Sequence, residues 1–146
     1  MIRRMSIEDV PQIAALEKAC FSDPWSERSI ATELSNPYSL WLVWEEEGTV
    51  LGYIGSQSVP PEADVMNLAV APEYRKRKIG SKLLTALCEA LDSQGIGKLL
   101  LEVRASNAPA ICLYEGFGFE VLGRRPKYYV NPVEDAYIMG KELSPC

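Results

Sequence analysis

A run of four consecutive basic residues, 75–78, is the first feature of the chain that could do chemistry. It follows an apolar run of strand length, 65–70, and Pro72, which cannot continue a strand ladder. It precedes Gly80 and a stretch in which apolar residues recur about once per turn on one side of a helix. That stripe comprises Ile79, Leu83, Leu84, Leu87 and Leu91. A helix N-terminus of this kind presents unpaired N–H groups and the positive end of the helix dipole, so the spacing predicts a site for an anion, and in particular a phosphate.

The same basic run has a less specific interpretation, a turn that only meets solvent before a surface helix. Its place between a strand and a helix favours the anion site, because successive N–H groups at such a turn can form a concave nest. Lys78 restricts the backbone conformations that this loop can adopt, since lysine reaches a positive φ only at a cost in free energy. A lysine can still serve here if the loop stays right-handed and the Lys78 ammonium reaches a phosphate.

Glu102 is a second candidate, on a predicted strand that spans residues 98–104. Apolar residues occupy both faces of this strand, which is typical of a strand inside a sheet flanked by helices. Side chains alternate along a strand, so Glu102 shares a face with Leu100 and Arg104. A carboxylate in that position either serves as a proton acceptor or forms an ion pair with Arg104.

Length and composition indicate one globular domain that covers residues 1–146. Apolar residues make up 47% of the chain and charged residues 24%, an ordinary balance for a soluble protein. No apolar run reaches membrane-spanning length, and the first residues lead into acidic positions rather than into a signal-peptide core. We therefore predict a cytoplasmic protein without a membrane partner.

Several kinds of site are disfavoured by the side chains that the sequence lacks or leaves unpaired. The chain contains no histidine, which removes the commonest acid–base group and metal ligand. Its four cysteines lack the paired spacing of a disulfide or zinc framework and are interpreted as free thiols: Cys20, Cys88, Cys112 and Cys146. A net charge of −5 argues against nonspecific binding to nucleic acid. We expect no metal and no nucleic-acid partner, but a small anionic cofactor and a positively charged substrate.

Hydrophobic periodicity and capping signals predict the elements that must position these groups. Strands are expected at residues 2–5, 40–45, 50–58, 65–70, 98–104, 117–122 and 136–143. Helices are expected after Ser6, from Ser26 to Leu34, across the apolar stripe up to the stop signal at Gln94 and Gly95, and after Asn107. The inner stripe of the first helix comprises Ile13, Leu16, Ala19 and Cys20, and the last two strands flank a loop at 124–132. The resulting order, β-α-α-β-β-β-α-β-α-β-β, predicts a mixed α/β sheet.

That order and several motifs resemble the GNAT superfamily of N-acetyltransferases. Arg75 and Gly80 match the first and last positions of its acetyl-CoA-binding motif, Q/R-x-x-G-x-G/A, whereas Lys78 stands in place of the middle glycine. Within the superfamily the chain is most similar to the bacterial ribosomal-protein-alanine N-acetyltransferases, the RimI type. The motifs that carry this likeness are Pro24-Trp25-Ser26, Asn67-Leu68-Ala69-Val70, Leu101 to Asn107, Leu113-Tyr114-Glu115, Gly118-Phe119 and Tyr128-Tyr129. Residues 126–129 and 134–137 also resemble the catalytic subunit of the general N-terminal acetyltransferases.

The resemblance implies an acetyl-CoA site and two reacting side chains. The cofactor-binding residues that it implies are Leu68, Ala69, Val70, Arg75, Lys76, Arg77, Lys78, Ile79, Gly80, Ser81, Asn107 and Tyr114. Tyr114 matches the family's general acid for the departing thiolate, although a tyrosine at a helix–sheet interface is commonly a packing residue. Glu102 matches the family's proposed base, which acts through water or orients the amine.

The resemblance also implies the substrate. Trp25, Tyr128 and Tyr129 come from two loops that flank the substrate slot in relatives, and the alternative is that these rings plug a small core. The expected activity is direct acetyl transfer from acetyl-CoA to the α-amine of a protein's first residue, above all alanine, in a ribosomal protein. The alternatives are a transferase for lysine side chains or small amines and a CoA-binding sensor without activity.

Overall fold

The elements of the structure follow the predicted order. The computed structural model describes residues 1–75, 77–130 and 132–143. Its strands are β1 (Ile2–Arg4), β2 (Ser39–Glu46), β3 (Thr49–Val59), β4 (Glu62–Val70), β5 (Lys98–Arg104), β6 (Glu120–Tyr129) and β7 (Glu134–Glu142). Its helices are α1 (Val10–Cys20), α2 (Glu27–Glu33), α3 (Ile79–Ser93) and α4 (Ala108–Gly116), with short 3-10 turns at Ile7–Asp9 and Pro72–Tyr74. The prediction of a mixed α/β fold is confirmed.

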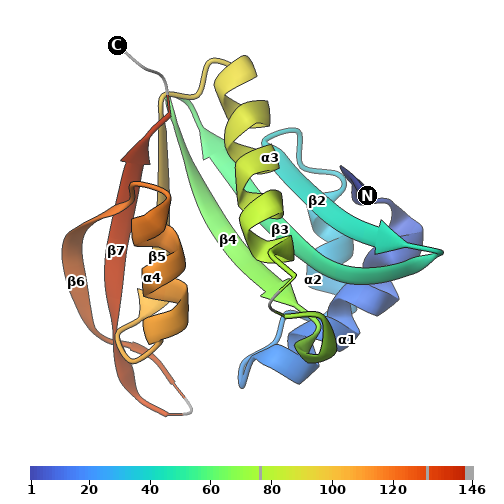
Figure 1. Ribbon diagram of the computed structural model, residues 1–146, viewed down its shortest axis with the longest axis horizontal. Helices are drawn as coiled ribbons and strands as arrows, with labels where there is room; N and C mark the ends of the chain where they lie inside the picture. The colour runs from blue at the N-terminus through green and yellow to red at the C-terminus, as the bar shows by residue number, and fades with distance from the viewer. Residues whose placement is uncertain (76, 131, 144–146) are drawn as a thin grey trace.

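The strands form one sheet of seven, in the order β1-β2-β3-β4-β5-β7-β6. Neighbouring strands are antiparallel except β4 and β5, which pair in parallel from Glu62 with Lys98 to Val65 with Leu101. Beyond that last pair the two strands diverge, as Figure 1 shows between β4 and β5. Each strand therefore has an edge without a neighbouring strand along the remainder of its length.

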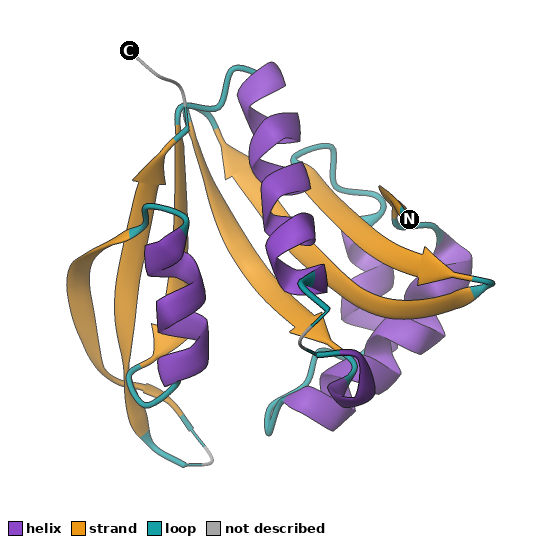
Figure 2. Cartoon of the chain, in the orientation of Figure 1, coloured by secondary structure: helices purple, strands orange, loops and turns teal. Residues whose placement is uncertain are grey.

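Helices cover the two sides of this split unequally. Helix α3 packs on β2, β3 and β4, and α1 and α2 cover the opposite face of the same strands (Figure 2). The predicted stripe of α3 is fully buried: Ile79, Leu83, Leu84, Leu87 and Leu91. Each such side chain contributes roughly 1.5–3 kcal/mol by leaving water. Helix α4 lies on the α3 side of β5 and β7, where Tyr114 joins the same core.

Strand β4 carries a bulge at the point where it leaves β5. Its register with β3 shifts, so that Gly55 faces Asn67 while the next residue, Ser56, faces Val65. Met66 is therefore an extra residue on β4, a bulge that bends a strand and breaks its regular pairing. The bulge falls directly after Val65, the last residue of β4 that pairs with β5.

The bulge also changes which β4 side chains face which layer of helices. Val65 packs in the core beneath α3, and Met66 packs in the core beside α1. Leu68 then returns to the α3 core, and Ala69 belongs to the α1 core. Side chains normally alternate with a period of two, so the extra residue exchanges the faces of all later positions.

The predicted ends of the last hairpin were wrong. Strand β6 begins at Glu120 rather than at 117, because α4 ends at Gly116 with Phe117 as its C-cap, and Gly118 takes a φ of +91° in the turn that follows. It then continues through residues 124–129, which were predicted as loop. This part of β6 is a sheet edge with both faces exposed, so it shows no apolar alternation, and an edge strand tolerates Pro126.

Helix α1 differs from the prediction at two positions. Ile13 and Leu16 are buried as predicted and Cys20 is half-buried, but Ala19 is exposed. Its place in the inner stripe is taken by Glu17, whose exposed fraction is 0%. Sequence patterning assigns glutamate to the solvent face, whereas here the carboxylate finds hydrogen-bond donors inside the protein.

Candidate functional site

The backbone of β4 beyond the bulge presents unpaired polar groups to the split. The N–H of Ala71 donates to the carbonyl of Leu51 at 2.8 Å, which makes these opposite residues a hydrogen-bonded pair. Such pairs alternate along antiparallel strands, so Ala69 turns its N–H and C=O toward β3. The polar groups of Leu68 and Val70 point the other way, toward the edge that β5 has left.

The contacts of the Val70 carbonyl agree with this direction. It accepts from Arg75 Nε at 3.2 Å and from Cys20 Sγ at 3.7 Å, both of which lie outside the sheet. The guanidinium of Arg75 also lies 3.4 Å from Cys20 Sγ through its Nη2. Of the three β4 residues predicted to meet the cofactor, Leu68 and Val70 therefore offer outward N–H groups, and Ala69 does not.

The helix start beside β4 has the features of an anion site. Lys78 precedes α3 and makes no side-chain cap, so the first N–H groups of α3, from Ile79, Gly80 and Ser81, keep the free donors of a helix N-terminus. The loop does not stay right-handed, which was the condition for lysine to serve, because Lys78 has φ of +61° and ψ of +23°. The loop thus takes the left-handed turn that a glycine would take freely, at a cost to lysine.

Gly80 leaves room above this turn. A Cβ at Gly80 would lie 3.8 Å from Val70 Cγ2 and 3.9 Å from Leu113 Cδ2, which are ordinary contact distances. The fold therefore does not require glycine here. Its lack of a side chain instead keeps the helix N-terminus accessible between β4 and α4.

The basic loop is partly held by the protein itself. Arg77 donates to Glu46 at 2.8 Å, and its guanidinium lies 5.4 Å from the ring centre of Tyr74. Arg75 is held against Val70 as described above. Lys76, which was also predicted to bind the cofactor, lies outside the described residues.

Glu102 lies on the β5 side of the split with an unsatisfied oxygen. Its Oε2 is buried without a hydrogen-bond partner among the described residues, and the nearest cation is Arg125, whose Nε is 3.9 Å away. The alternative of an ion pair with Arg104 is not what the structure has. Arg104 pairs with Glu134 at 3.3 Å and lies over the ring of Tyr129 at 4.4 Å. A buried acceptor without a donor is suited to an ammonium or a water that arrives with a substrate.

Two tyrosines at the end of β6 surround this carboxylate. The rings of Tyr128 and Tyr129 meet edge to face with centres 5.0 Å apart. Burial, and then the neighbouring charge of Glu102, raise the pKa of Tyr129 to about 12. Burial also raises the pKa of Tyr128, with Glu102 as the next cause. Both tyrosines belong to a strand end and not to a loop as predicted.

A further carboxylate, from β4, lies near the same group. Burial raises the pKa of Asp64, and the negative charge of Glu102 raises it further. Since Asp64 lies opposite Leu100 in the β4–β5 pairing, the acidic character extends to both strands at the closed end of the split.

Tyr114 reaches the site from α4. Its ring packs edge to face on Phe119 with centres 5.6 Å apart, and the residue is only 7% exposed, so the packing interpretation holds for the ring. Burial raises the pKa of Tyr114 to about 12, and the nearby phenol of Tyr129 is the second cause. Asn107 caps the same helix by accepting from the N–H of Ala110 at 3.3 Å, as predicted.

Trp25 lies in the loop between α1 and α2. Its ring is half-buried and meets Trp41 edge to face at 5.4 Å. The backbone N–H of Trp25 donates to Glu17 Oε1 at 2.8 Å, and Asn67 Nδ2 donates to the other oxygen of Glu17, also at 2.8 Å. Glu17 was not among the residues predicted for the site. The signal for it was a carboxylate four residues after Ile13 on the apolar face of a helix.

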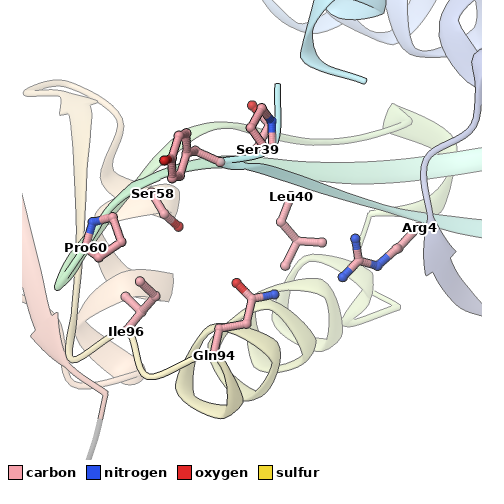
Figure 3. Close-up of a pocket in the computed structure, with 9 residues that line it drawn as sticks. Arg4, Ser39, Leu40, Ser58, Pro60, Gln94 and Ile96 are labelled. Atoms are coloured by element: carbon pink, nitrogen blue, oxygen red, sulfur yellow. The ribbon is translucent and has the colours of Figure 1, made fainter. Parts of the chain in front are cut away.

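One pocket of the structure includes a predicted substrate residue, and another lies elsewhere. A concave surface of about 450 Å³ is lined by residues 23–26 and Ser29, and so includes Trp25. A second pocket, of about 250 Å³, lies at the other end of α3 from the basic loop, where Arg4, Leu40 and Gln94 line it (Figure 3). None of the residues predicted for the cofactor or substrate lines this second pocket.

The described ranges, 1–75, 77–130 and 132–143, hold neither a metal-ligand cluster nor a membrane-spanning helix. No group of three or more metal-ligating side chains occurs there. Likewise, no helix in that part of the chain is long and apolar enough to cross a membrane.

Comparison with known proteins identifies the family. The family model described as "Acetyltransferase (GNAT) family" matches residues 10–119 of the chain. The chain belongs to the GNAT acetyltransferase family.

Individual GNAT relatives match over nearly the full length. A protein of Bacillus subtilis named putative ribosomal protein bS18-alanine N-acetyltransferase is 39% identical over 139 residues, covering 94% of this chain and 92% of the relative. The ribosomal protein bS18-alanine N-acetyltransferase of Escherichia coli K12 is 36% identical over 145 residues, covering 98% and 97%. The crystal structure of the ribosomal-protein-S18-alanine N-acetyltransferase from Escherichia coli superposes with a TM-score of 0.92 at 34% identity, covering 100% of this chain and 95% of that one. The predicted GNAT fold is thereby confirmed.

Proposed function

We propose that this GNAT enzyme transfers acetyl from acetyl-CoA to the α-amine of an N-terminal alanine, in ribosomal protein bS18. The observation that carries the proposal is the split between β4 and β5. One side of it presents the outward backbone groups of Leu68 and Val70, and the other presents the buried Oε2 of Glu102, which has no hydrogen-bond partner among the described residues. A thioester and an amine need these two kinds of surface facing each other.

The donor fits the β4 side. The pyrophosphate of acetyl-CoA would meet the uncapped N-terminus of α3, where Gly80 leaves space. The pantetheine arm would follow the free edge of β4, and an outward N–H of Leu68 or Val70 would face the thioester oxygen. Negative charge develops on that oxygen as the amine attacks, so a donor fixed by the strand lowers the barrier.

The β5 side supplies the proton chemistry. Glu102 would accept a proton from the amine through a water or hold the amine in place. Tyr114 would donate to the departing thiolate. A phenol with a pKa of about 12 is a far weaker acid than a thiol with a usual pKa near 8.5, so hydrogen bonding to the thiolate contributes more than complete proton transfer.

Proton arithmetic favours an α-amine over a lysine side chain. An α-amine with a pKa near 8 is roughly one-tenth neutral at pH 7, whereas a lysine with a pKa near 10.4 is neutral about 0.04% of the time. The difference is about 3 kcal/mol, which a lysine acetyltransferase must recover by desolvation or a strong base. The site offers no histidine for that purpose. The names of the relatives support alanine as the first residue and bS18 as the acceptor.

Mass spectrometry tests the proposal. The protein is incubated with acetyl-CoA and an alanine-initiated bS18 peptide that also contains lysines, and the labelled residue is located by fragmentation. We expect the acetyl group on the α-amine. Label mainly on the lysines would support the alternative of a lysine acetyltransferase, and binding of acetyl-CoA without any transfer would support a sensor.

A further inference from the structure

Glu17 is a buried carboxylate that the proposed reaction does not use. It lies in α1 with an exposed fraction of 0%, and both of its oxygens accept from uncharged donors. One donor is the backbone N–H of Trp25, and the other is the side-chain amide of Asn67. The carboxylate is therefore satisfied by hydrogen bonds, and no ion pair with it occurs among the described residues.

Such a group is costly to bury. Burial raises the pKa of Glu17, while the two hydrogen bonds lower it again only in part. An apolar side chain would fill the same place between Ile13 and the sheet without this cost. The packing of α1 alone thus gives no reason for a carboxylate at this position.

The two donors belong to parts of the molecule that meet at the split. Asn67 is the first residue of β4 after the bulge at Met66, and β4 is fixed there by its pairing with β3. Trp25 belongs to the loop between α1 and α2, which contains no strand or helix of its own. Glu17 therefore ties a loop without regular hydrogen bonds to a strand that is already held.

We propose that Glu17 is a positioning residue that holds the Trp25 loop against β4 and so sets the wall of the site that receives the peptide. This inference rests on the proposed function, because it assigns the loop to the peptide. The residue touches neither reacting group and acts through the N–H of Trp25. We expect the loss of Glu17 to weaken the reaction with the peptide and to leave acetyl-CoA binding unchanged. The proposed acetyl-CoA site lies along β4 and at the N-terminus of α3, away from the loop.

The chain offers a matched control in a second buried glutamate. Glu33, in α2, is 7% exposed and accepts from Ser39 Oγ, Trp41 Nε1 and Gln57 Nε2. Its partners belong to β2 and β3. One of them, Trp41, also packs against the Trp25 ring, and Glu33→Met leaves the Trp41 ring itself unchanged. Replacing Glu33 removes a buried carboxylate from the same layer of helices while leaving both bonds of Glu17 in place.

The experiment compares Glu17→Met, Glu17→Gln and Glu33→Met. Met has similar length but offers no oxygen, whereas the side-chain amide that Glu17→Gln introduces can accept from Trp25 and donate to Asn67 once the Asn67 amide turns over. Steady-state kinetics on the alanine-initiated peptide, calorimetric binding of acetyl-CoA, and hydrogen–deuterium exchange of residues 21–26 are measured for each. In Glu17→Met we expect kcat/KM for the peptide to fall by about 10- to 100-fold, the scale of a displaced positioning contact, with the Kd of acetyl-CoA within about threefold.

Loop exchange should rise in Glu17→Met and return near the wild-type rate in Glu17→Gln, together with the peptide kinetics. Glu33→Met should change neither. Wild-type peptide kinetics in a folded Glu17→Met variant, or an equal loss in Glu33→Met, would overturn the inference. If Glu17→Met does not fold, Asn67→Ala removes the anchor on β4 without changing α1, and the same peptide-specific loss is required. A wild-type protein that fails to acetylate the peptide defeats the proposed function instead, and exchange in the 21–26 loop then decides whether Glu17 holds it.

Discussion

The two sides of the split present different chemistry to each other. On the β4 side the groups that face it are backbone N–H and C=O of Leu68 and Val70, joined by the N-terminus of α3. On the β5 side they are side chains, namely Glu102, Tyr129 and, from α4, Tyr114. Helices cover both faces of the β4 side, whereas on the β5 side only α4 covers the sheet in the part of the chain that the structure describes.

This difference predicts which substitutions matter on each side. A site built from backbone N–H and C=O groups keeps its ligand affinity when a side chain is removed, but it loses affinity when an added side chain blocks those groups. A site built from side chains loses activity when a single polar atom is removed from one of them. Substitutions that add or delete atoms on the two sides should therefore give opposite patterns, in acetyl-CoA binding on the β4 side and in turnover on the β5 side.

The largest effect is expected from adding a side chain at Gly80. Gly80→Glu places a carboxylate over the α3 N-terminus, where it blocks the approach of a phosphate and repels its charge. We expect acetyl-CoA binding to fall below detection by isothermal titration calorimetry. Folding should persist, because a Cβ at this position meets only Val70 and Leu113 at ordinary distances.

Gly80→Ala is the control for Gly80→Glu. It adds the Cβ without the charge, and its thermal unfolding should match that of the wild type. If Gly80→Glu binds acetyl-CoA normally while remaining folded, the α3 N-terminus is not the phosphate site.

Deleting one oxygen on the β5 side should have the next largest effect. Tyr114→Phe should lower kcat by about 10- to 1,000-fold while leaving the Kd of acetyl-CoA nearly unchanged, because the hydroxyl acts as the thiolate departs. The pKa of Tyr114, about 12, lies above the assay range, so the phenol stays protonated. The wild-type rate should rise from about pH 6 to about pH 9 as the α-amine loses its proton, and should not fall at about pH 10. Unchanged turnover in the variant would remove Tyr114 from the mechanism.

A smaller loss is expected for Glu102→Gln. We expect kcat/KM to fall by about tenfold near pH 6.5, where the amine most needs an acceptor, and by less near pH 9, where the amine is already neutral. Removing the charge of Glu102 should also lower the pKa of Tyr129, since that charge is the second cause of its rise. Tyrosine carbon-13 NMR titration measures this change.

Asp64→Asn is the matched control for Glu102. It removes a neighbouring carboxylate whose pKa is raised by burial and by nearby negative charge, and it should change kcat/KM by less than about twofold. An equal loss in both variants would indicate a shared electrostatic effect and not a specific role of Glu102.

The smallest effect is expected from removing a side chain on the β4 side. Lys78→Gly relieves a φ of +61° and should raise the free energy of unfolding by up to about 1 kcal/mol. The affinity for acetyl-CoA should stay within a few-fold, because backbone N–H groups bind the phosphate. Calorimetry and thermal unfolding measure the two quantities.

Lys127→Gly provides the comparison for Lys78→Gly. Lys127 has a φ of +52° on β6, far along the chain from the basic loop, so it should give a similar gain in stability with no change in acetyl-CoA affinity. A large loss of affinity in Lys78→Gly alone would show that the Lys78 ammonium contributes to binding.

Much of the fold could be predicted because its signals are local. The apolar stripe of α3 and the cap at Asn107 depend on residues within a few positions of each other, and both are as predicted. The same holds for the strand at 98–104, whose bounds agree with β5. The later part of β6 could not be predicted, because an edge strand with two exposed faces carries no alternation.

The site was only partly predictable for a related reason. The family resemblance named Glu102 and Tyr114 as catalytic candidates and Tyr129 as a substrate candidate, and in the structure Tyr129 lies near enough to both for their pKa values to be linked. The left-handed turn at Lys78 and the burial of Glu17 were not predicted. In both cases distant parts of the chain override a local preference, by holding a loop between two elements or by supplying two donors 8 and 50 residues away.

The bulge at Met66 makes the activity sensitive to the number of residues in β4 and less so to their identity. Deleting Met66 would give strict alternation with Asn67 still toward α1 and Leu68 still beneath α3, but it would remove the bulge at which β4 leaves β5. Without that bulge β4 could continue its pairing with β5 past Val65 and cover the outward N–H groups of Leu68 and Val70, although no catalytic side chain had been replaced. Point substitutions at Met66 leave the count intact. Deleting the bulge residue is therefore a change that would close the split while leaving every reacting group in the chain.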